Sequence, residues 1–243
     1  MFGGAGNDAY FVDDGGDVLI ENSGEGTDAV FSTAHLRLSE NVGTLVLQGG
    51  GTTLQGYGNS QANKLYGNTG SNLLDGGTGA DVMRGDTGND VYFVDDAGDL
   101  VFENLGAGTD AVFATVIQTL AANLETLVLQ GSANLTGTGN GLDNKLFGNA
   151  GDAGFDVLNG GAGNDTFVFG ADFAGEVIED FTAGQDSLRF VGFGTAAEGA
   201  TFMFVPGPGS QFWQVHSGLD GHNEFITING FGTGSVINDF GFV

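Results

Sequence analysis

The sequence predicts an all-β fold in which short strands stack in parallel coils, with antiparallel strands closing the C-terminal end. Three observations lead to this class. The chain repeats itself at long range, it repeats again every nine residues, and 47 of its 243 residues are glycine. Such a chain buries the apolar side of each turn only against the neighbouring turns, which is the architecture of a solenoid.

The long repeat appears when the sequence is aligned with itself. Residues 6–31 (GNDAYFVDDGGDVLIENSGEGTDAVF) match 88–113 (GNDVYFVDDAGDLVFENLGAGTDAVF), an offset of 82 residues. TLVLQG occurs at 44–49 and again at 126–131. A third copy begins at Gly160 and then diverges. A long period of this kind is typical of stacked structural units.

A nine-residue period runs inside the long repeat. From residue 58 the blocks are GNSQANKLY, GNTGSNLLD, GGTGADVMR, GDTGNDVYF and VDDAGDLVF, followed by a two-residue insert, EN, and LGAGTDAVF. Each block is rich in glycine over about five positions, has Asp or Asn at the sixth and a large apolar residue at the eighth. Glycine at the second and fourth positions permits a tight turn with positive φ. Positions seven to nine form a short strand whose middle residue points inward.

One coil therefore takes two blocks, or eighteen residues, and alternate blocks stack on the same edge. This parity places Asp81 over Asp99 on one edge. On the other edge it places Asn72, Asp90 and Asp110 in one column, and in the first copy it stacks Asp8 on Asp28. Tyr10, Tyr92, Phe11 and Phe93 are expected to be stacked core residues rather than a carbohydrate-binding platform.

These blocks resemble the repeats-in-toxin (RTX) family, whose nonapeptide G-G-x-G-x-D-x-U-x forms a calcium-binding parallel β-helix. The resemblance covers roughly residues 3–170, with gaps at 32–57 and 114–138, and it implies a right-handed parallel β-roll (β-solenoid). It implies calcium ions between stacked loops, held by the sixth-position carboxylates and by loop carbonyl oxygens. The implied carboxylates are Asp8, Asp17, Asp28, Asp81, Asp90, Asp99, Asp110, Asp156 and Asp165, and the implied loop glycines are Gly4, Gly6, Gly26, Gly77, Gly79, Gly88, Gly108, Gly161 and Gly163. The sequence departs from the family pattern at Asn63, Asn72 and Asn144, where the loss of a charge predicts weak or empty sites.

The residue types support calcium without the resemblance. Calcium takes six to eight oxygen ligands from carboxylates and carbonyls in flexible geometry. Two stacked carboxylates about 4–5 Å apart repel by about 4 kcal/mol at an effective dielectric constant near 20, so a column of them favours a cation between its members. The alternative is that the aspartates only form turns, but turn residues rarely hold one register over so many blocks.

Composition excludes several classes of protein. The chain has 31 acidic and 5 basic residues, for a net charge of −26, which disfavours nucleic acid and anionic membranes as partners. It has no cysteine, so a disulfide framework and a thiolate metal site are both excluded. We find no apolar run long enough for a membrane span and no cleavable signal peptide at the N-terminus.

The last third of the chain, 171–243, is expected to be an antiparallel β cap. GEVIEDFTAGQDSLRF (175–190) is similar to the segment that closes the roll in type I-secreted bacterial proteins, and Asp180 and Asp186 are candidates for a further calcium site. The chain ends NDFGFV, an acid followed by apolar residues, which is similar to the uncleaved signal read by a type I exporter. The alternative is that these residues are simply the last strand of the cap.

The expected function is that of a calcium-binding module, 1–170, with its cap and secretion signal, which folds on calcium binding after export from a bacterium. The chain begins in mid-pattern, so we expect it to be the C-terminal part of a longer extracellular protein. One alternative is a calcium-dependent structural or adhesive protein that self-associates as a surface layer, fibre or matrix. Another is the C-terminal part of a secreted enzyme. The chain itself shows no catalytic motif and is not expected to be an enzyme. His216, His222 and Glu224 are better explained as cap-loop residues than as a metal trio.

Overall fold

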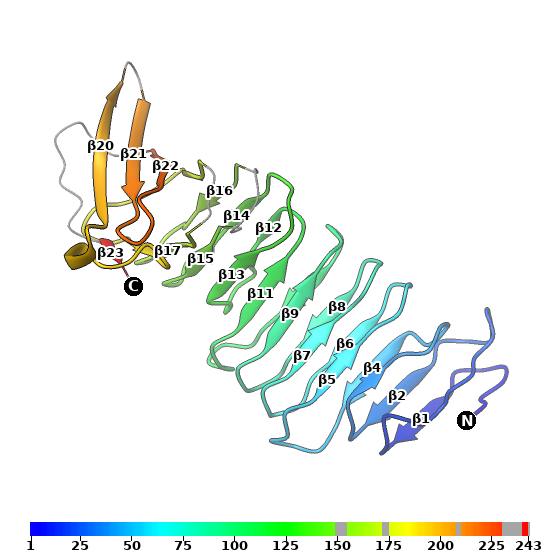
Figure 1. The fold of residues 1–243 in the computed structure, drawn as a ribbon. Helices are drawn as coiled ribbons and strands as arrows, with labels where there is room; N and C mark the ends of the chain where they lie inside the picture. The colour runs from blue at the N-terminus through cyan, green and yellow to red at the C-terminus, as the bar shows by residue number, and fades with distance from the viewer. Residues whose placement is uncertain (149–154, 172–174, 208–209, 230–239, 243) are drawn as a thin grey trace. The chain divides into compact units, whose positions relative to one another are not determined.

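The structure is a computed structural model that describes residues 1–148, 155–171, 175–207, 210–229 and 240–242. The chain forms two compact units. Unit 1 comprises Met1–Phe113 with Ala121–Leu124, and unit 2 comprises Ala114–Leu120 with Glu125–Val243. As predicted, the fold is a parallel β-solenoid with a mixed sheet towards the C-terminus (Figure 1).

Unit 1 consists of short parallel strands that belong to two sheets. The first sheet has the order β1-β2-β4-β6-β8-β10 and the second contains β11-β9-β7-β5-β3. The strands are β1 (Ala9–Val12), β2 (Ala29–Ser32), β3 (Leu36–Arg37), β4 (Thr44–Leu47), β5 (Gln55–Tyr57), β6 (Lys64–Tyr66), β7 (Leu73–Asp75), β8 (Val82–Arg84), β9 (Val91–Val94), β10 (Leu100–Phe102) and β11 (Ala111–Ala114). Strands persist through the two stretches, 32–57 and 114–138, in which the glycine-aspartate loops lapse.

The core of unit 1 lies between its two sheets and is one side chain deep from each. The middle residues of the short strands, such as Leu65 and Met83 in one sheet and Leu74 and Tyr92 in the other, are all 0% exposed. Each such aliphatic residue contributes about 1.5–3 kcal/mol by leaving water. The eighth position of the nonapeptide therefore supplies the core, as the sequence predicts.

The prediction for the neighbouring phenylalanines was wrong in part. Tyr10 and Tyr92 are buried, but Phe11 is 70% exposed. The ring of Phe11 stacks on Phe31 at a centroid distance of 5.3 Å, and Phe93 stacks on Phe113 at 5.4 Å. Because successive residues of a strand point to opposite faces, an inward tyrosine at position eight directs the following phenylalanine outward.

Unit 2 continues the same plan and then changes it. Strands β13-β15-β17-β19-β23 lie in one sheet, and β12-β14-β16-β18-β22-β21-β20 form the other. The bounds are β12 (Gln118–Thr119), β13 (Thr126–Leu129), β14 (Thr136–Thr138), β15 (Lys145–Phe147), β16 (Val157–Asn159), β17 (Thr166–Phe169), β18 (Val177–Ile178), β19 (Ser187–Phe190), a 3-10 turn η1 (Ala196–Glu198), β20 (Thr201–Gly207), β21 (Ser210–His216), β22 (Asn223–Ile228) and β23 (Phe240–Phe242).

Parallel pairing does not stop where the nonapeptides stop. Strands β18 and β19 follow Gly170 yet pair in parallel with β16 and β17. The antiparallel part consists of β20, β21 and β22, and β22 itself pairs in parallel with β18. Strand β23, within the final residues, pairs in parallel with β19, so the described part of the chain's ending forms a strand, whereas Asp239 and Val243 lie outside the described residues.

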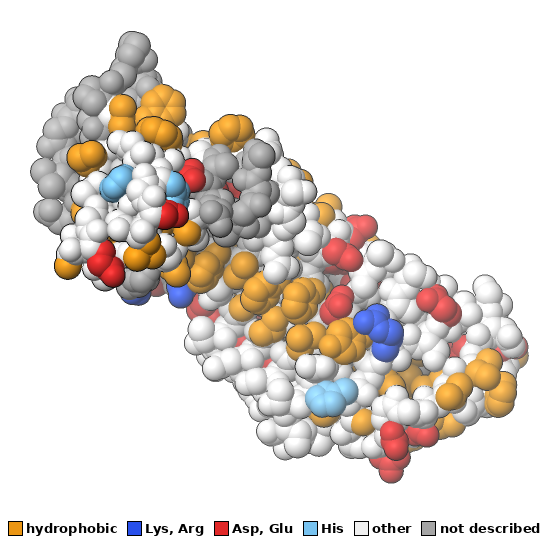
Figure 2. Space-filling view, in the orientation of Figure 1, with side chains coloured by type: hydrophobic (Ala, Val, Ile, Leu, Met, Phe, Trp, Pro, Cys, Tyr) orange, Lys and Arg blue, Asp and Glu red, His pale blue; other side chains and the backbone are white. Residues whose placement is uncertain are grey.

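The surface carries fewer carboxylates than the composition suggests. On the face in Figure 2, acidic side chains are scattered among small polar side chains and backbone, although the chain has 31 acidic residues. Several aspartates are instead buried in the loops between strands. Within the described part of the chain, no helix has the length and apolar character needed to cross a bilayer.

Candidate metal centre

The sixth-position side chains of unit 1 stand in columns. The backbone N–H of Asn63 donates to Asp81 Oδ1 at 2.6 Å, and the N–H of Asp81 donates to Asp99 Oδ1 at 2.9 Å. Each step spans eighteen residues, so one coil takes two nonapeptides and the stacking of Asp81 on Asp99 is confirmed.

The opposite edge and the first copy follow the predicted parity as well. Asn72 N–H donates to Asp90 Oδ1 at 2.6 Å, and Asp90 N–H donates to Asp110 Oδ1 at 2.7 Å. Asp8 N–H donates to Asp28 Oδ1 at 2.9 Å. The last two steps span 20 residues because each contains the two-residue EN insert.

The columns of unit 2 have longer coils. The N–H groups of Asn144 and Asp165 donate to the Oδ1 atoms of Asp165 and Asp186 at 2.8 and 2.9 Å, and both steps span 21 residues. Leu135 N–H donates to Asp156 Oδ1 over the same spacing. The eighteen-residue coil therefore describes only the part of the chain built from uninterrupted nonapeptides.

The two aspartates predicted near the C-terminal end serve different loops. Asp180 accepts the N–H groups of Gly160 and Gly161, one on each carboxylate oxygen, at 2.8 and 2.7 Å. Asp186 continues the Asp165 column and accepts Thr182 N–H on its second oxygen. Thr182 links the two residues, because its hydroxyl donates to the main-chain carbonyl of Asp180, but the two carboxylates accept hydrogen bonds from different residues.

Several carboxylates of unit 1 keep one oxygen unpaired. Oδ2 of Asp8, Asp81 and Asp90 is buried and has no hydrogen-bond partner among the described residues. Burial raises the pKa of Asp90 to about 7 and that of Asp81 to about 6, with neighbouring carboxylates acting in the same direction. In unit 2, burial raises the pKa of Asp165 to about 6. Burying an anionic oxygen without a hydrogen-bond partner destabilises the folded state, and a cation beside these carboxylates would offset that cost.

The loop glycines bring neighbouring coils into close contact. A Cβ on Gly108 would lie 1.6 Å from the carbonyl oxygen of Gly88, and one on Gly26 would lie 1.7 Å from that of Gly6. Only glycine fits at such an approach. Left-handed φ values occur at the predicted positions Gly4, Gly6, Gly26, Gly77, Gly79, Gly88, Gly161 and Gly163, whereas Gly108 is required by contact alone.

Buried carboxylate oxygens without partners match the hard oxygen ligands that calcium prefers. Asp8, Asp81 and Asp90 have the donor atoms to hold such ions, together with carbonyls of the adjacent loops. An ion held there would supply the positive charge that these positions lack.

Two predicted positions behave differently in the two copies of the long repeat. Asp99 is 8% exposed and accepts N–H groups from Asp81, Asp95 and Asp96. Its counterpart Asp17 is exposed, although the backbone N–H of both residues donates to the carbonyl three positions earlier. The structure therefore places Asp99 in a column and Asp17 on the surface.

Sequence reasoning missed two glutamates. Carboxylate oxygens of Asp8, Glu21 and Asp28 lie within 4.8 Å of one another, and so do those of Asp90, Glu103 and Asp110. Glu21 and Glu103 are the first residues of the two EN inserts, which break the nine-residue period. Their recurrence at both inserts was the available signal.

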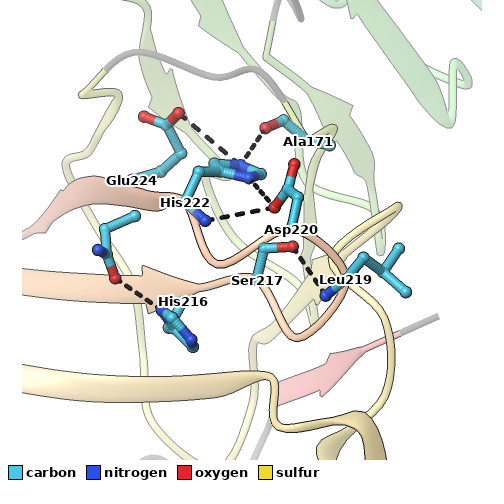
Figure 3. A network of polar contacts seen from close by, with 8 residues as sticks. Ala171, His216, Ser217, Leu219, Asp220, His222 and Glu224 are labelled. Atoms are coloured by element: carbon cyan, nitrogen blue, oxygen red, sulfur yellow. Dashed lines mark hydrogen bonds and ion pairs between the residues drawn. The ribbon is translucent and has the colours of Figure 1, made fainter.

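The histidines of unit 2 do not form a metal trio. His222 pairs through Nδ1 with Asp220, its Nε2 lies 2.8 Å from the Ala171 carbonyl, and Glu224 is 3.9 Å away (Figure 3). His216 instead contacts Asn223 at 2.9 Å. The hydrogen bond with His222 lowers the pKa of Asp220 to about 2, and it raises the pKa of His222. The expectation that these are loop residues is wrong in part, because His216 ends β21 and Glu224 lies in β22, whereas His222 lies in the loop between the two strands.

Comparison with known families agrees with the geometry. The family model of the RTX calcium-binding nonapeptide repeat matches in four copies over residues 1–19, 57–92 and 138–173. A search of curated proteins found no match to the chain. The matched segments contain Asp8, Asp81, Asp90 and Asp165, at the same positions as the columns described above. These three segments of the chain therefore carry RTX calcium-binding nonapeptide repeats.

Proposed function

We propose that this calcium-binding structural module folds on calcium binding after type I secretion and thereby stabilises and helps to export a larger extracellular bacterial protein. The observation that carries the proposal is the set of buried carboxylate oxygens without partners in the columns of unit 1. Asp81 and Asp90 are 0% and 1% exposed. The structure records no ion pair between either residue and Lys or Arg within its described part.

The energetic argument follows from burial. Desolvating one carboxylate costs several kcal/mol unless an opposite charge compensates it. A chain with a net charge of −26 also resists compaction through self-repulsion. Cations bound between the coils offset both the desolvation of the carboxylates and the repulsion between them. The free energy of calcium binding therefore contributes directly to folding. Because calcium is scarce in the cytosol and abundant outside, folding waits until the chain has left the cell.

Calcium titration tests this directly. We expect circular dichroism to show a mostly unfolded chain in the presence of chelator. The strand signal should then appear cooperatively as calcium is added. Magnesium is the control, since it requires tighter octahedral geometry and releases its water reluctantly. Full strand signal in chelator would refute the proposal.

The export role is assigned to the C-terminal segment, 171–243. A passenger fused to these residues should reach the medium from a host with a matching exporter, and removal of residues 239–243 should retain it in the cell. Strand β23 lies within the removed segment, so both fusions are first compared by circular dichroism in calcium. Equal export of a folded truncated fusion would show that these residues act only as a strand.

Each of the two alternative functions predicts one observation that distinguishes it from an export module. A surface layer, fibre or matrix predicts calcium-dependent self-association in a concentration series, whereas an export module stays monomeric. The C-terminal part of a secreted enzyme predicts a catalytic domain upstream in the full-length reading frame.

A further inference from the structure

Each copy of the long repeat in unit 1 builds the same cluster of acidic side chains around a glycine. In the first copy the cluster is Asp8, Glu21 and Asp28, and in the second it is Asp90, Glu103 and Asp110. Corresponding residues are 82 positions apart. The glutamates come from the EN inserts and, like Asp28 and Asp110, lie outside the segments matched by the nonapeptide repeat. The nonapeptide pattern therefore does not account for the two glutamates.

A buried tyrosine points into each cluster. Around Gly3, the position of a Cβ would lie 2.1 Å from Tyr10 Oη, 2.4 Å from Glu21 Oε1 and 2.5 Å from Asp8 Oδ2. Around Gly85, the corresponding position lies 2.1 Å from Asp90 Oδ2 and 2.4 Å from Tyr92 Oη. Polar atoms of both copies thus converge on a space that a glycine leaves open.

Four polar atoms of the first cluster have no hydrogen-bond partner among the described residues. Tyr10 is 6% exposed, and its hydroxyl has no hydrogen-bond partner among the described residues. Both carboxylate oxygens of Glu21 and Oδ2 of Asp8 are also buried without partners. In the second cluster Tyr92 donates to Glu103, while Oδ2 of Asp90 remains unpaired. A tyrosine hydroxyl and a glutamate left unpaired side by side indicate that a ligand takes the place of their mutual hydrogen bond.

We propose that each cluster is a three-carboxylate calcium site, in which the insert glutamate, Glu21 or Glu103, joins the two stacked aspartates of adjacent coils. This inference rests on the proposed function and adds a ligand that the nonapeptide does not supply. Three carboxylates converging within 4.8 Å offer hard anionic oxygens only, which suits calcium. Ligand charge is one of the properties that set calcium affinity, so these two sites bind more tightly than those held by two aspartates.

Isosteric replacement of the glutamates tests the proposal. Glu103→Gln removes one charge but keeps the size of the side chain and its ability to accept a hydrogen bond from Tyr92. We expect calorimetry to show one ion bound at least tenfold more weakly in Glu103→Gln, one in Glu21→Gln and two in the double variant. Glu40→Gln is the matched control, because Glu40 is exposed and lies outside both clusters; it should bind calcium as the wild type does.

Terbium gives a second readout that does not depend on the glutamate variants. This lanthanide occupies calcium sites and emits when a nearby aromatic ring is excited. The wild type should show tyrosine-sensitised emission that calcium competes away, and Tyr10→Phe with Tyr92→Phe should remove most of it.

The outcomes separate this proposal from the proposed function. Unchanged calcium affinities and ion number in Glu21→Gln and Glu103→Gln would show that the glutamates are not ligands, even though the chain still folds on calcium. Terbium emission that survives the double Tyr→Phe replacement would also overturn the inference. A wild-type chain that binds no calcium would instead refute the proposed function.

Discussion

Residues 58–75 and residues 76–110 form coils with the same backbone arrangement. The two regions differ in how the buried side chain at position six is hydrogen-bonded. Both have stacked sixth-position side chains whose Oδ1 atoms or backbone N–H groups link successive coils. In the first region the sixth-position residues are Asn63 and Asn72, and in the second they are Asp81, Asp90, Asp99 and Asp110.

The asparagine coils are satisfied within the protein. Oδ1 of Asn63 and of Asn72 accepts the N–H of Asn59 and of Asn68, both at 2.7 Å. Asn63 Nδ2 donates to the Val42 carbonyl at 3.2 Å, and Asn59 Nδ2 donates to the same carbonyl at 2.9 Å. An amide has both donors and acceptors, so it closes the network without an ion. Asn144 in unit 2 accepts Asn140 N–H in the same way.

The aspartate coils are not closed in this way. Ionised carboxylates can only accept hydrogen bonds, and Oδ2 of Asp81 and of Asp90 finds no donor among the described residues. Asn63 and Asn72 are satisfied without an ion, whereas Asp81 and Asp90 each keep one unpaired oxygen. We therefore expect a calcium requirement at the two aspartates and none at the two asparagines. The asparagine coils form a section whose stability is expected to be independent of calcium.

The largest expected effect comes from converting aspartate coils into asparagine coils. Asp81→Asn with Asp90→Asn exchanges two unpaired buried charges for neutral amides, which we expect to favour the calcium-free fold by about 1–3 kcal/mol per site. With calcium present, the loss of ligands should destabilise the same variant. Circular dichroism should therefore show more strand signal in chelator and a smaller gain on adding calcium.

The control for this variant has the same charge but changes exposed residues. Asp13→Asn with Glu40→Gln also removes two negative charges, and both residues are exposed. If the control gains as much strand signal in chelator, the effect comes from net charge rather than from the columns. If the Asp81 and Asp90 variant loses strand signal in chelator, the unpaired oxygens are not a source of instability.

Much of the fold could be predicted because it depends on local rules. The nine-residue period places a strand at positions seven to nine and a turn before it, and this predicts β6, β7, β8 and β9. The pairing of alternate blocks then follows from geometry, since one coil takes two blocks. Asp90 over Asp110 follows from the same argument once the EN insert is counted.

The remainder depends on the path of the chain in space. Glu103 lies thirteen positions after Asp90, and no sequence period shows that both belong to one cluster with Asp110. Asp17 and Asp99 occupy equivalent positions, but only Asp99 is held by the N–H of a residue in the preceding coil. The 21-residue coils of unit 2 arise where insertions break the period, and their register is fixed by pairing such as that of β15 with β17.

A smaller effect separates neighbours in space from neighbours in sequence. Asp90 is linked to Asn72 and Asp110 along its column, while Asp99, nine residues away, is linked to Asp81 on the other edge. Asp90→Ala should raise the calcium concentration needed for folding more than Asp28→Ala does, because it removes a ligand between two loops. A double-mutant cycle should give a coupling free energy of about 0.5–3 kcal/mol for Asp90 with Asp110, as contacting residues do, and much less for Asp90 with Asp99. The measurement is the calcium midpoint of folding for the wild type, the four single Ala variants and the two double Ala variants. Stronger coupling between Asp90 and Asp99 would mean that an ion bridges consecutive nonapeptides, and the columns would then not be the units that bind calcium.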